Sequence, residues 1–214
     1  MYYYLFQLLI LGNVLLSEVL GHGRLVEPPS RASMWRYGFD NPRDDDDQEG
    51  NCGGYSLQWD VNNGECGICG DAWNLREPRP HETGGKYGNG VIARKYRAGT
   101  MIPIKVEITA FHEGYFEFRL CPMKQRGVEV TAECLDQNIL IGADGKSWYF
   151  PQYGPGLVDL NYKLPANMTC EQCVLQWKYV TGNSWGDCGD GIEAAGCGPQ
   201  EEFRDCADVS ISDN

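Results

Sequence analysis

The residues best suited to metal chemistry are the three histidines of the chain, His22, His81 and His112. His22 follows an apolar stretch that predicts an export signal over residues 1–21, with the small residue Gly21 at the cut and Val19 two positions before it. The stretch is too short for a membrane span and is broken by Asn13. Its removal would give His22 a free α-amino group, and an amine and an imidazole on one residue form a bidentate chelate. One imidazole nitrogen of His112 would complete a set of three nitrogens, which suits copper.

Simpler interpretations of the same histidines stay open at this point. A histidine can follow a signal by chance, and His112 can be a polar residue at a strand end. His81, in the segment Pro80-His81-Glu82, is expected to be a structural or surface histidine. A copper site would show itself by its pH dependence, because copper must displace the ammonium proton and its affinity then falls as pH drops.

The cysteine count indicates an oxidising compartment and up to five disulfides. Two Cys-x-x-Cys pairs, at 66/69 and 170/173, raise the alternative of a four-cysteine zinc site, which their wide separation disfavours. The sequence leaves the connectivity open. Asn167, in Asn167-Met168-Thr169, is a predicted glycosylation site on a surface loop. The ten cysteines are Cys52, Cys66, Cys69, Cys121, Cys134, Cys170, Cys173, Cys188, Cys197 and Cys206.

The net charge of −12 argues against partners that are themselves polyanions, namely nucleic acids and anionic membranes. It does not argue against a neutral, insoluble polysaccharide. The mature chain has no further apolar segment long enough for a membrane anchor, so we expect a soluble, secreted protein. The acidic run Asp44 to Asp47 lacks the alternating spacing of a calcium loop, and a solvated loop is expected there.

The elements that must position the histidines are predicted to be strands. Residues 101–110 alternate strictly between apolar and polar types, and residues 115–121 alternate again after a turn at Glu113-Gly114. These two runs are interpreted as an antiparallel pair with a short connection. Further strands are predicted over 173–180 and 205–211.

The fold class predicted from these patterns is all-β, an immunoglobulin- or fibronectin-like β-sandwich with long, disulfide-pinned loops and short helices. The loops are expected over residues 22 to about 90, which are rich in Gly, Pro, Asp and Asn. Trp177 and Tyr179 are expected in the core rather than on a substrate platform. Residues 22–214 are expected to form one domain.

A glycosidase is a poor interpretation of the acidic residues near the second alternating run. Glu113 and Glu117 could imitate its two carboxylates, but Glu117 faces away from Phe116 and Phe118, and no second acid is convincingly placed opposite it.

The mature sequence resembles lytic polysaccharide monooxygenases, most of all auxiliary activity family fifteen, known chiefly from arthropods and other animals. The resemblance begins at the predicted mature terminus and covers essentially the whole mature chain. Each motif alone is weak, and together they are specific. The segments that carry it are residues 22–31 (His22-Gly23-Arg24-Leu25 onward), 35–39, 52–54, 66–71, 77–81, 109–112 (Thr109-Ala110-Phe111-His112), 114–118, 175–180 and 203–211.

The resemblance implies a role for five residues. His22 and His112 match the histidine brace that holds a single copper ion, and Ala110 matches the small residue over one axial face of the metal. Phe203 falls where such enzymes have an axial Tyr or Phe, and without a hydroxyl it would leave that axial position without an oxygen ligand. Glu201 matches the Gln or Glu that orients the oxygen co-substrate.

The activity that follows from the resemblance is oxidative cleavage of β-1,4 bonds in a crystalline polysaccharide, with O2 or H2O2 as co-substrate and an external electron donor. Chitin is the expected substrate, because many of the similar animal proteins act on it, and cellulose stays open. The protein is expected to be a monomer. Two alternatives belong to other classes: a non-catalytic chitin-binding module, and a copper-binding or copper-transfer protein that uses the same brace without a polysaccharide.

Overall fold

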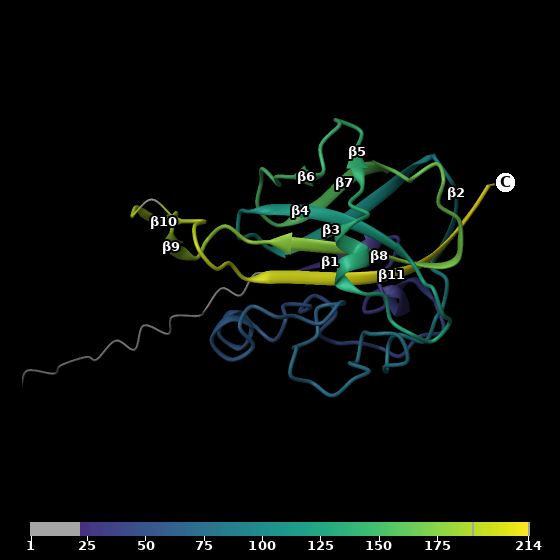
Figure 1. Ribbon diagram of the computed structural model, residues 1–214, viewed down its shortest axis with the longest axis horizontal. Coiled ribbons are helices and arrows are strands. Elements are labelled where there is room, and N and C mark those ends of the chain that lie inside the picture. Colours follow the sequence, from purple (N-terminus) through teal and green to yellow (C-terminus); the bar gives the residue numbers. More distant parts are fainter. Residues whose placement is uncertain (1–21, 190, 214) are drawn as a thin grey trace, which may run out of the picture.

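The computed structural model describes residues 22–189 and 191–213, and in these residues two β-sheets pack face to face (Figure 1). The predicted signal over residues 1–21 lies outside the described residues. All strand pairs are antiparallel except β2 with β11. The first sheet has the order β1 (His22–Glu27), β3 (Met101–Ala110), β7 (Gly156–Lys163) and β5 (Ile141–Gly142). The second has the order β2 (Arg94–Arg97), β11 (Glu202–Ser212), β8 (Cys170–Val180), β4 (Tyr115–Pro122) and β6 (Trp148–Tyr149).

Short elements complete the architecture. The strands β9 (Trp185–Asp187) and β10 (Glu193–Ala195) form a hairpin that extends beyond one end of the sandwich, at the left of Figure 1. The helical segments are η1 (Met34–Tyr37), η2 (Leu57–Val61) and α1 (Ala132–Asp136). No helix in the described part of the chain is long and apolar enough to cross a membrane.

The core lies between the two sheets and is built from the alternating residues of the predicted strands. In β3 the side chains of Ile102, Ile104, Val106 and Ile108 are at most 1% exposed. The facing residues of β4, β8 and β11 are aromatic or aliphatic and equally buried, and Trp177 and Tyr179 are among them, as expected. The period of two therefore places one face of each strand in the core, and the predicted sandwich is confirmed.

The predicted pairing of the first two alternating runs is wrong. β3 pairs with β1 and β7, whereas β4 pairs with β8 and β6 in the opposite sheet. The connection over residues 111–114 therefore crosses from one sheet to the other, and it does so with positive φ at Glu113 (53°) and Gly114 (78°). Both runs bury an apolar face, so they can face each other across the core as readily as they can share a sheet.

Strand β1 was not predicted, because residues 22–27 contain too few apolar residues to alternate clearly. Its form depends on its partners. It pairs along β3, and the buried Leu25 donates its backbone N–H to Asp205 Oδ2 of β11 at 2.8 Å. The strand thereby contacts both sheets of the sandwich.

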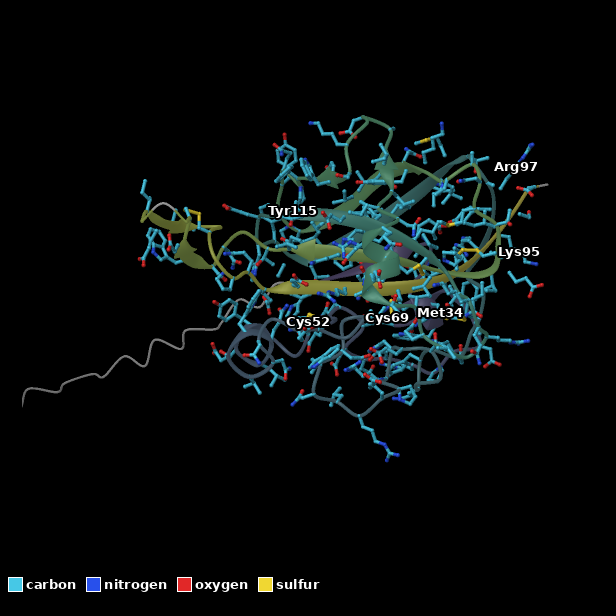
Figure 2. The ribbon with its side chains drawn as sticks, viewed as in Figure 1. Met34, Cys52, Cys69, Lys95, Arg97 and Tyr115 are labelled. Carbon is cyan, nitrogen blue, oxygen red and sulfur yellow. A yellow bond between two sulfur atoms is a disulfide. The ribbon has the colours of Figure 1, made fainter. Side chains whose placement is uncertain are left out.

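The long loops that follow β1 pack against the outer face of the five-stranded sheet, below β11 in Figure 1. Two disulfides hold them there. Cys52–Cys66 closes a loop within this region, and Cys69–Cys206 joins it to β11. Figure 2 shows Cys52 and Cys69 on this side of the strand. The remaining disulfides are Cys121–Cys134, Cys170–Cys173 and Cys188–Cys197, so that all ten cysteines are paired and the two Cys-x-x-Cys pairs form no zinc site.

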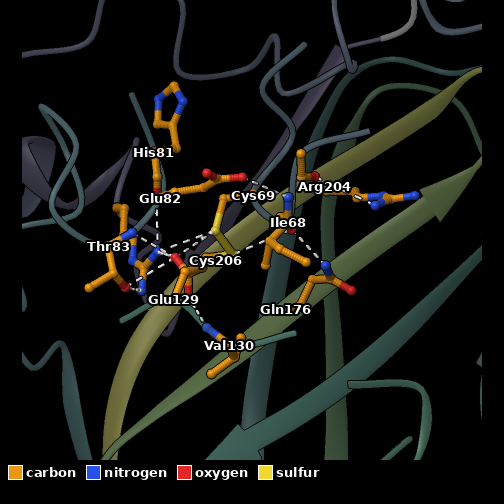
Figure 3. The surroundings of a disulfide bond; sticks show 12 residues. Ile68, Cys69, His81, Glu82, Thr83, Glu129, Val130, Gln176, Arg204 and Cys206 are labelled. Atoms are coloured by element: carbon orange, nitrogen blue, oxygen red, sulfur yellow. Dashed lines mark hydrogen bonds and ion pairs between the residues drawn. A yellow bond between two sulfur atoms is a disulfide. The ribbon is translucent and has the colours of Figure 1, made fainter. Parts of the chain in front are cut away.

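A buried polar network surrounds the Cys69–Cys206 disulfide (Figure 3). Glu129 accepts hydrogen bonds from the backbone N–H of Thr83 at 2.7 Å and from the guanidinium of Arg31 at 2.6 Å. Arg31 is 1% exposed and also binds Asp208 of β11. The charges of Arg31, Glu129 and Asp208 are thus paired with one another, because an unpaired buried charge would be strongly destabilising.

The acidic run at residues 44–47 is only partly the solvated loop that we predicted. Asp45 and Asp46 are exposed, but Asp44 and Asp47 are buried. Asp47 binds two arginines, Arg24 of β1 and Arg36. The run carries no calcium-type cluster of ligands among the described residues. The two arginines lie outside the acidic run, so the spacing of the charges within the run does not indicate that Asp47 is buried.

Candidate metal centre

The register of β1 on β3 brings the two predicted copper ligands to one end of the sandwich. His22 is the Cα partner of Ala110, the last residue of β3, and His112 follows two residues later in the crossing connection. Both histidines therefore lie at the same edge of the fold, although they are far apart in sequence.

Gly23 is needed at its position for a steric reason. A Cβ at residue 23 would lie 3.0 Å from the ring of Trp177 and 3.1 Å from the carbonyl oxygen of Glu107. The backbone N–H of Gly23 donates to the carbonyl of Gln48 at 3.2 Å. The backbone next to His22 therefore packs closely between a core aromatic and a neighbouring strand.

The His22 imidazole is partly buried, with 21% of its side chain exposed. Its Nε2 is shielded from solvent, has no hydrogen-bond partner among the described residues, and lies 3.5 Å from Glu49 Oε1. Only Nδ1 can form a chelate ring with the α-amine of the same residue. Nδ1 is therefore the nitrogen of this ring that we expect to be a ligand.

His112 is 7% exposed and is held through its backbone on both sides. Its N–H donates to the hydroxyl of Tyr179 at 3.1 Å, and its carbonyl accepts from the N–H of Gly182 at 2.9 Å. The Tyr179 hydroxyl in turn donates to the carbonyl of Glu113 at 2.6 Å, and burial raises the pKa of Tyr179 to about 12, so this donor stays protonated. The sequence pattern predicted Tyr179 in the core but not this polar contact, because periodicity does not show which groups a buried hydroxyl binds.

Two other predicted site residues, Phe203 and Glu201, lie in or directly before β11 of the opposite sheet. Phe203 is fully buried in β11, is the register partner of Tyr179, and its ring centroid lies 5.8 Å from that of Tyr179. Glu201 precedes β11 and accepts at its carbonyl the N–H of Thr181. Its side chain is buried, its Oε1 has no hydrogen-bond partner among the described residues, and burial raises its pKa to about 7. Ala110, Phe203 and Glu201 therefore come from strand ends at the same edge as the two histidines.

His81 lies in a separate buried cluster and takes no part in this arrangement. Its Nδ1 lies 2.8 Å from Asp71 Oδ1 and its Nε2 lies 2.9 Å from Asp44 Oδ2, while its ring stacks on Tyr87. Burial lowers its pKa, but the hydrogen bonds to Asp44 and Asp71 outweigh this and raise the pKa to about 9. The histidine is structural, and it joins two loops of the region between β1 and β2.

The donor set at the shared edge fits copper. Two imidazoles and one amine are nitrogen ligands that bind Cu(II) tightly, and the amine becomes available when the chain starts at His22. The cysteines of the described residues are all in disulfides, so none of them offers a thiolate ligand. Ala110, a small residue, is the direct register partner of His22.

Comparison with known proteins identifies the family of this chain. The family model for lytic polysaccharide mono-oxygenase, described as cellulose-degrading, matches residues 22–209. A solved structure, the AA15 lytic polysaccharide monooxygenase from Thermobia domestica in the Cu(I) state, is 46% identical, with a TM-score of 0.88, 90% of this chain covered and 100% of that chain. A comparison with curated protein sequences finds no match. The chain belongs to the lytic polysaccharide monooxygenases of the AA15 type, copper-dependent oxidative enzymes that use one copper ion.

Proposed function

We propose that this monooxygenase cleaves chitin, with its copper ion held by the α-amine and Nδ1 of His22 and by a ring nitrogen of His112. The observation that carries the ligand assignment is the β1–β3 register, which pairs His22 with Ala110 and sets His112 beside them. The family match begins at His22, which supports removal of residues 1–21. Members of the family are generally secreted, and we infer the same for this chain, with residues 22–214 acting as one catalytic domain and as a monomer.

The bound copper supplies the one-electron redox chemistry with O2 or H2O2 that attack on an unactivated C–H bond requires. The chain contributes position and exclusion. Gly23 and Trp177 fix the backbone of His22, and Tyr179 and Gly182 fix that of His112. Beside a copper ion held by the two histidines, Ala110 would present only a methyl group, and Phe203 would present an apolar ring without an oxygen ligand.

Glu201 is proposed to orient the oxygen co-substrate. Its carboxyl is buried, with Oε1 unpaired among the described residues, and a pKa of about 7 lets it accept or hold a proton near neutral pH. Burial of a carboxyl without a hydrogen-bond partner lowers the stability of the fold, so a packing role alone does not account for it.

Chitin is proposed on the likeness to animal enzymes, since the solved relative comes from an insect. Cellulose is the competing polymer, and the description of the matching family names it. The experiment is mass spectrometry of soluble products after processed, copper-loaded protein is incubated with chitin or cellulose, with and without ascorbate. Oxidised chito-oligosaccharides that require ascorbate support the proposal. Oxidised products from cellulose alone would change the substrate. None from either polymer, despite copper binding, would favour another glycan as the substrate or the copper-binding alternative.

The ligand assignment has its own test. A protein that keeps one residue before His22 carries an amide in place of the amine, and we expect it to lose tight copper binding and activity. His112→Ala should do the same, while its thermal unfolding stays close to that of the parent. His81→Gln is the matched histidine variant, and it should retain copper binding. Full activity of the extended protein would refute the brace.

A further inference from the structure

Asn183 contacts the imidazole of His112 and does not belong to the predicted ligand set. Its side-chain Nδ2 lies 3.1 Å from His112 Nδ1. Neither the sequence patterns nor the resemblance singled this residue out. It lies between β8 and β9, directly after Gly182, whose N–H binds the carbonyl of the same histidine.

The backbone of Asn183 is fixed on both sides. On one side Gly182 packs against the crossing connection, where a Cβ at residue 182 would lie 2.8 Å from the nitrogen of Gly114. On the other side the buried Gln200 side chain binds both backbone groups of Ser184: Oε1 accepts its N–H at 3.0 Å and Nε2 donates to its carbonyl at 3.1 Å. Asn183 is therefore held at the imidazole by contacts on either side of it.

The contact decides which ring nitrogen of His112 can face a metal. Because the Asn183 side chain lies in front of Nδ1, a metal bound by this imidazole would have to approach Nε2. A neutral imidazole that gives the Nε2 lone pair to a metal carries its proton on Nδ1, and that N–H needs an acceptor. The carboxamide of Asn183 has one, Oδ1, which a half-turn about its last torsion places where Nδ2 now lies.

We propose that Asn183 is a positioning residue for His112, which accepts the Nδ1–H bond through Oδ1 and so orients Nε2 toward the copper ion. The inference rests on the proposed ligand set. Asn183 is exposed, so its amide can make the half-turn without breaking a buried hydrogen bond. Partners of this kind typically change metal affinity by about 10–100-fold when they are removed.

The test is copper(II) affinity and the electron paramagnetic resonance spectrum of variants of the processed protein. Asn183→Leu keeps the approximate size but removes the acceptor, and we expect copper affinity to fall at least about 10-fold, with altered copper hyperfine values. Asn183→Asp can only accept, so it should bind copper at least as tightly as the parent and keep its spectrum. Histidine-ring NMR of the protein with diamagnetic Cu(I) should show the His112 proton on Nδ1.

Two controls separate the hydrogen bond from other effects. Ser184→Asp adds the same charge one residue away, and Asn161→Leu makes the same substitution on β7 of the other sheet. Thermal unfolding without copper shows whether each variant folds. An Asn183→Leu variant that folds and matches the parent in affinity and spectrum overturns the inference, as does equal weakening by Asn183→Asp and Asn183→Leu. If the parent itself binds no copper, the proposed function fails first, and the two failures are thereby distinguished.

Discussion

The hydroxyl of Tyr179 offers the sharpest test of how the fold holds His112. It accepts the N–H of His112 at 3.1 Å and donates to the carbonyl of Glu113 at 2.6 Å, and therefore joins β8 to the connection between the sheets. Tyr179→Phe removes this atom alone. The ring should stay in place, because its centroid lies 4.9 Å from that of Phe116 and 5.8 Å from that of Phe203.

The two lost hydrogen bonds contribute unequally. Residue 112 is 7% exposed, so its N–H would be left buried without this partner, at a cost of about 1–3 kcal/mol. Glu113 is exposed, so its carbonyl can bind water instead, at little cost. We therefore expect the free energy of unfolding to fall by about 2 kcal/mol.

The assay is equilibrium denaturation by urea with the disulfides intact. Tyr96→Phe is the matched control, because the Tyr96 hydroxyl is buried without a hydrogen-bond partner among the described residues. Its removal should be neutral or slightly stabilising, since no bond is lost and a buried polar group disappears. Equal unfolding free energies for the two variants would refute the role assigned to the Tyr179 hydroxyl.

Two further perturbations test the turn beside the site and a buried carboxyl. Gly114→Ala should destabilise far more than Gly145→Ala: both residues have positive φ, 78° and 82°, but a Cβ at 114 would lie 2.0 Å from the carbonyl oxygen of Val180, whereas nothing lies within 4 Å at 145. Similar melting temperatures for these two variants would contradict the close approach. Burial raises the pKa of Asp205 to about 7 from an ordinary value of 3.8, so the folded state retains a proton that the unfolded state releases between these values. The protonated Asp205 therefore contributes its full stabilisation to the free energy of unfolding below about pH 4. This stabilisation is lost as pH rises to about 7, and the free energy of unfolding then falls by at most about 1.4 kcal/mol per pH unit. Asp205→Asn should remove this component, and parallel curves of unfolding free energy against pH for parent and variant would show that Asp205 does not titrate in this way.

Local periodicity determined much of the fold in advance. The alternation in residues 101–110 is a property of neighbouring residues, and it placed Ile102 to Ile108 on one buried face without knowledge of their partners. The histidines of the site could be named from the sequence for a related reason. The chain has three histidines, so few imidazole ligands had to be considered, and the resemblance covers the segments that contain them.

Tertiary structure decided what depends on contacts between distant segments. β3 and β4 are neighbours in sequence, yet they lie in opposite sheets, because two amphipathic strands can bury their apolar faces against each other as well as side by side. That crossing is what brings His112 to the edge where β1 begins. Asp44 and Asp47 were predicted to be solvated. In the fold they are buried, because His81 binds Asp44 and the two arginines Arg24 and Arg36 bind Asp47. The contacts of Tyr179 and Asn183 with His112 join residues about 70 positions apart, as the separations of 67 and 71 show, and no local pattern records them. The sequence identifies the residue types that are capable of the chemistry, and the packing of distant strand ends determines which of these residues lie close together.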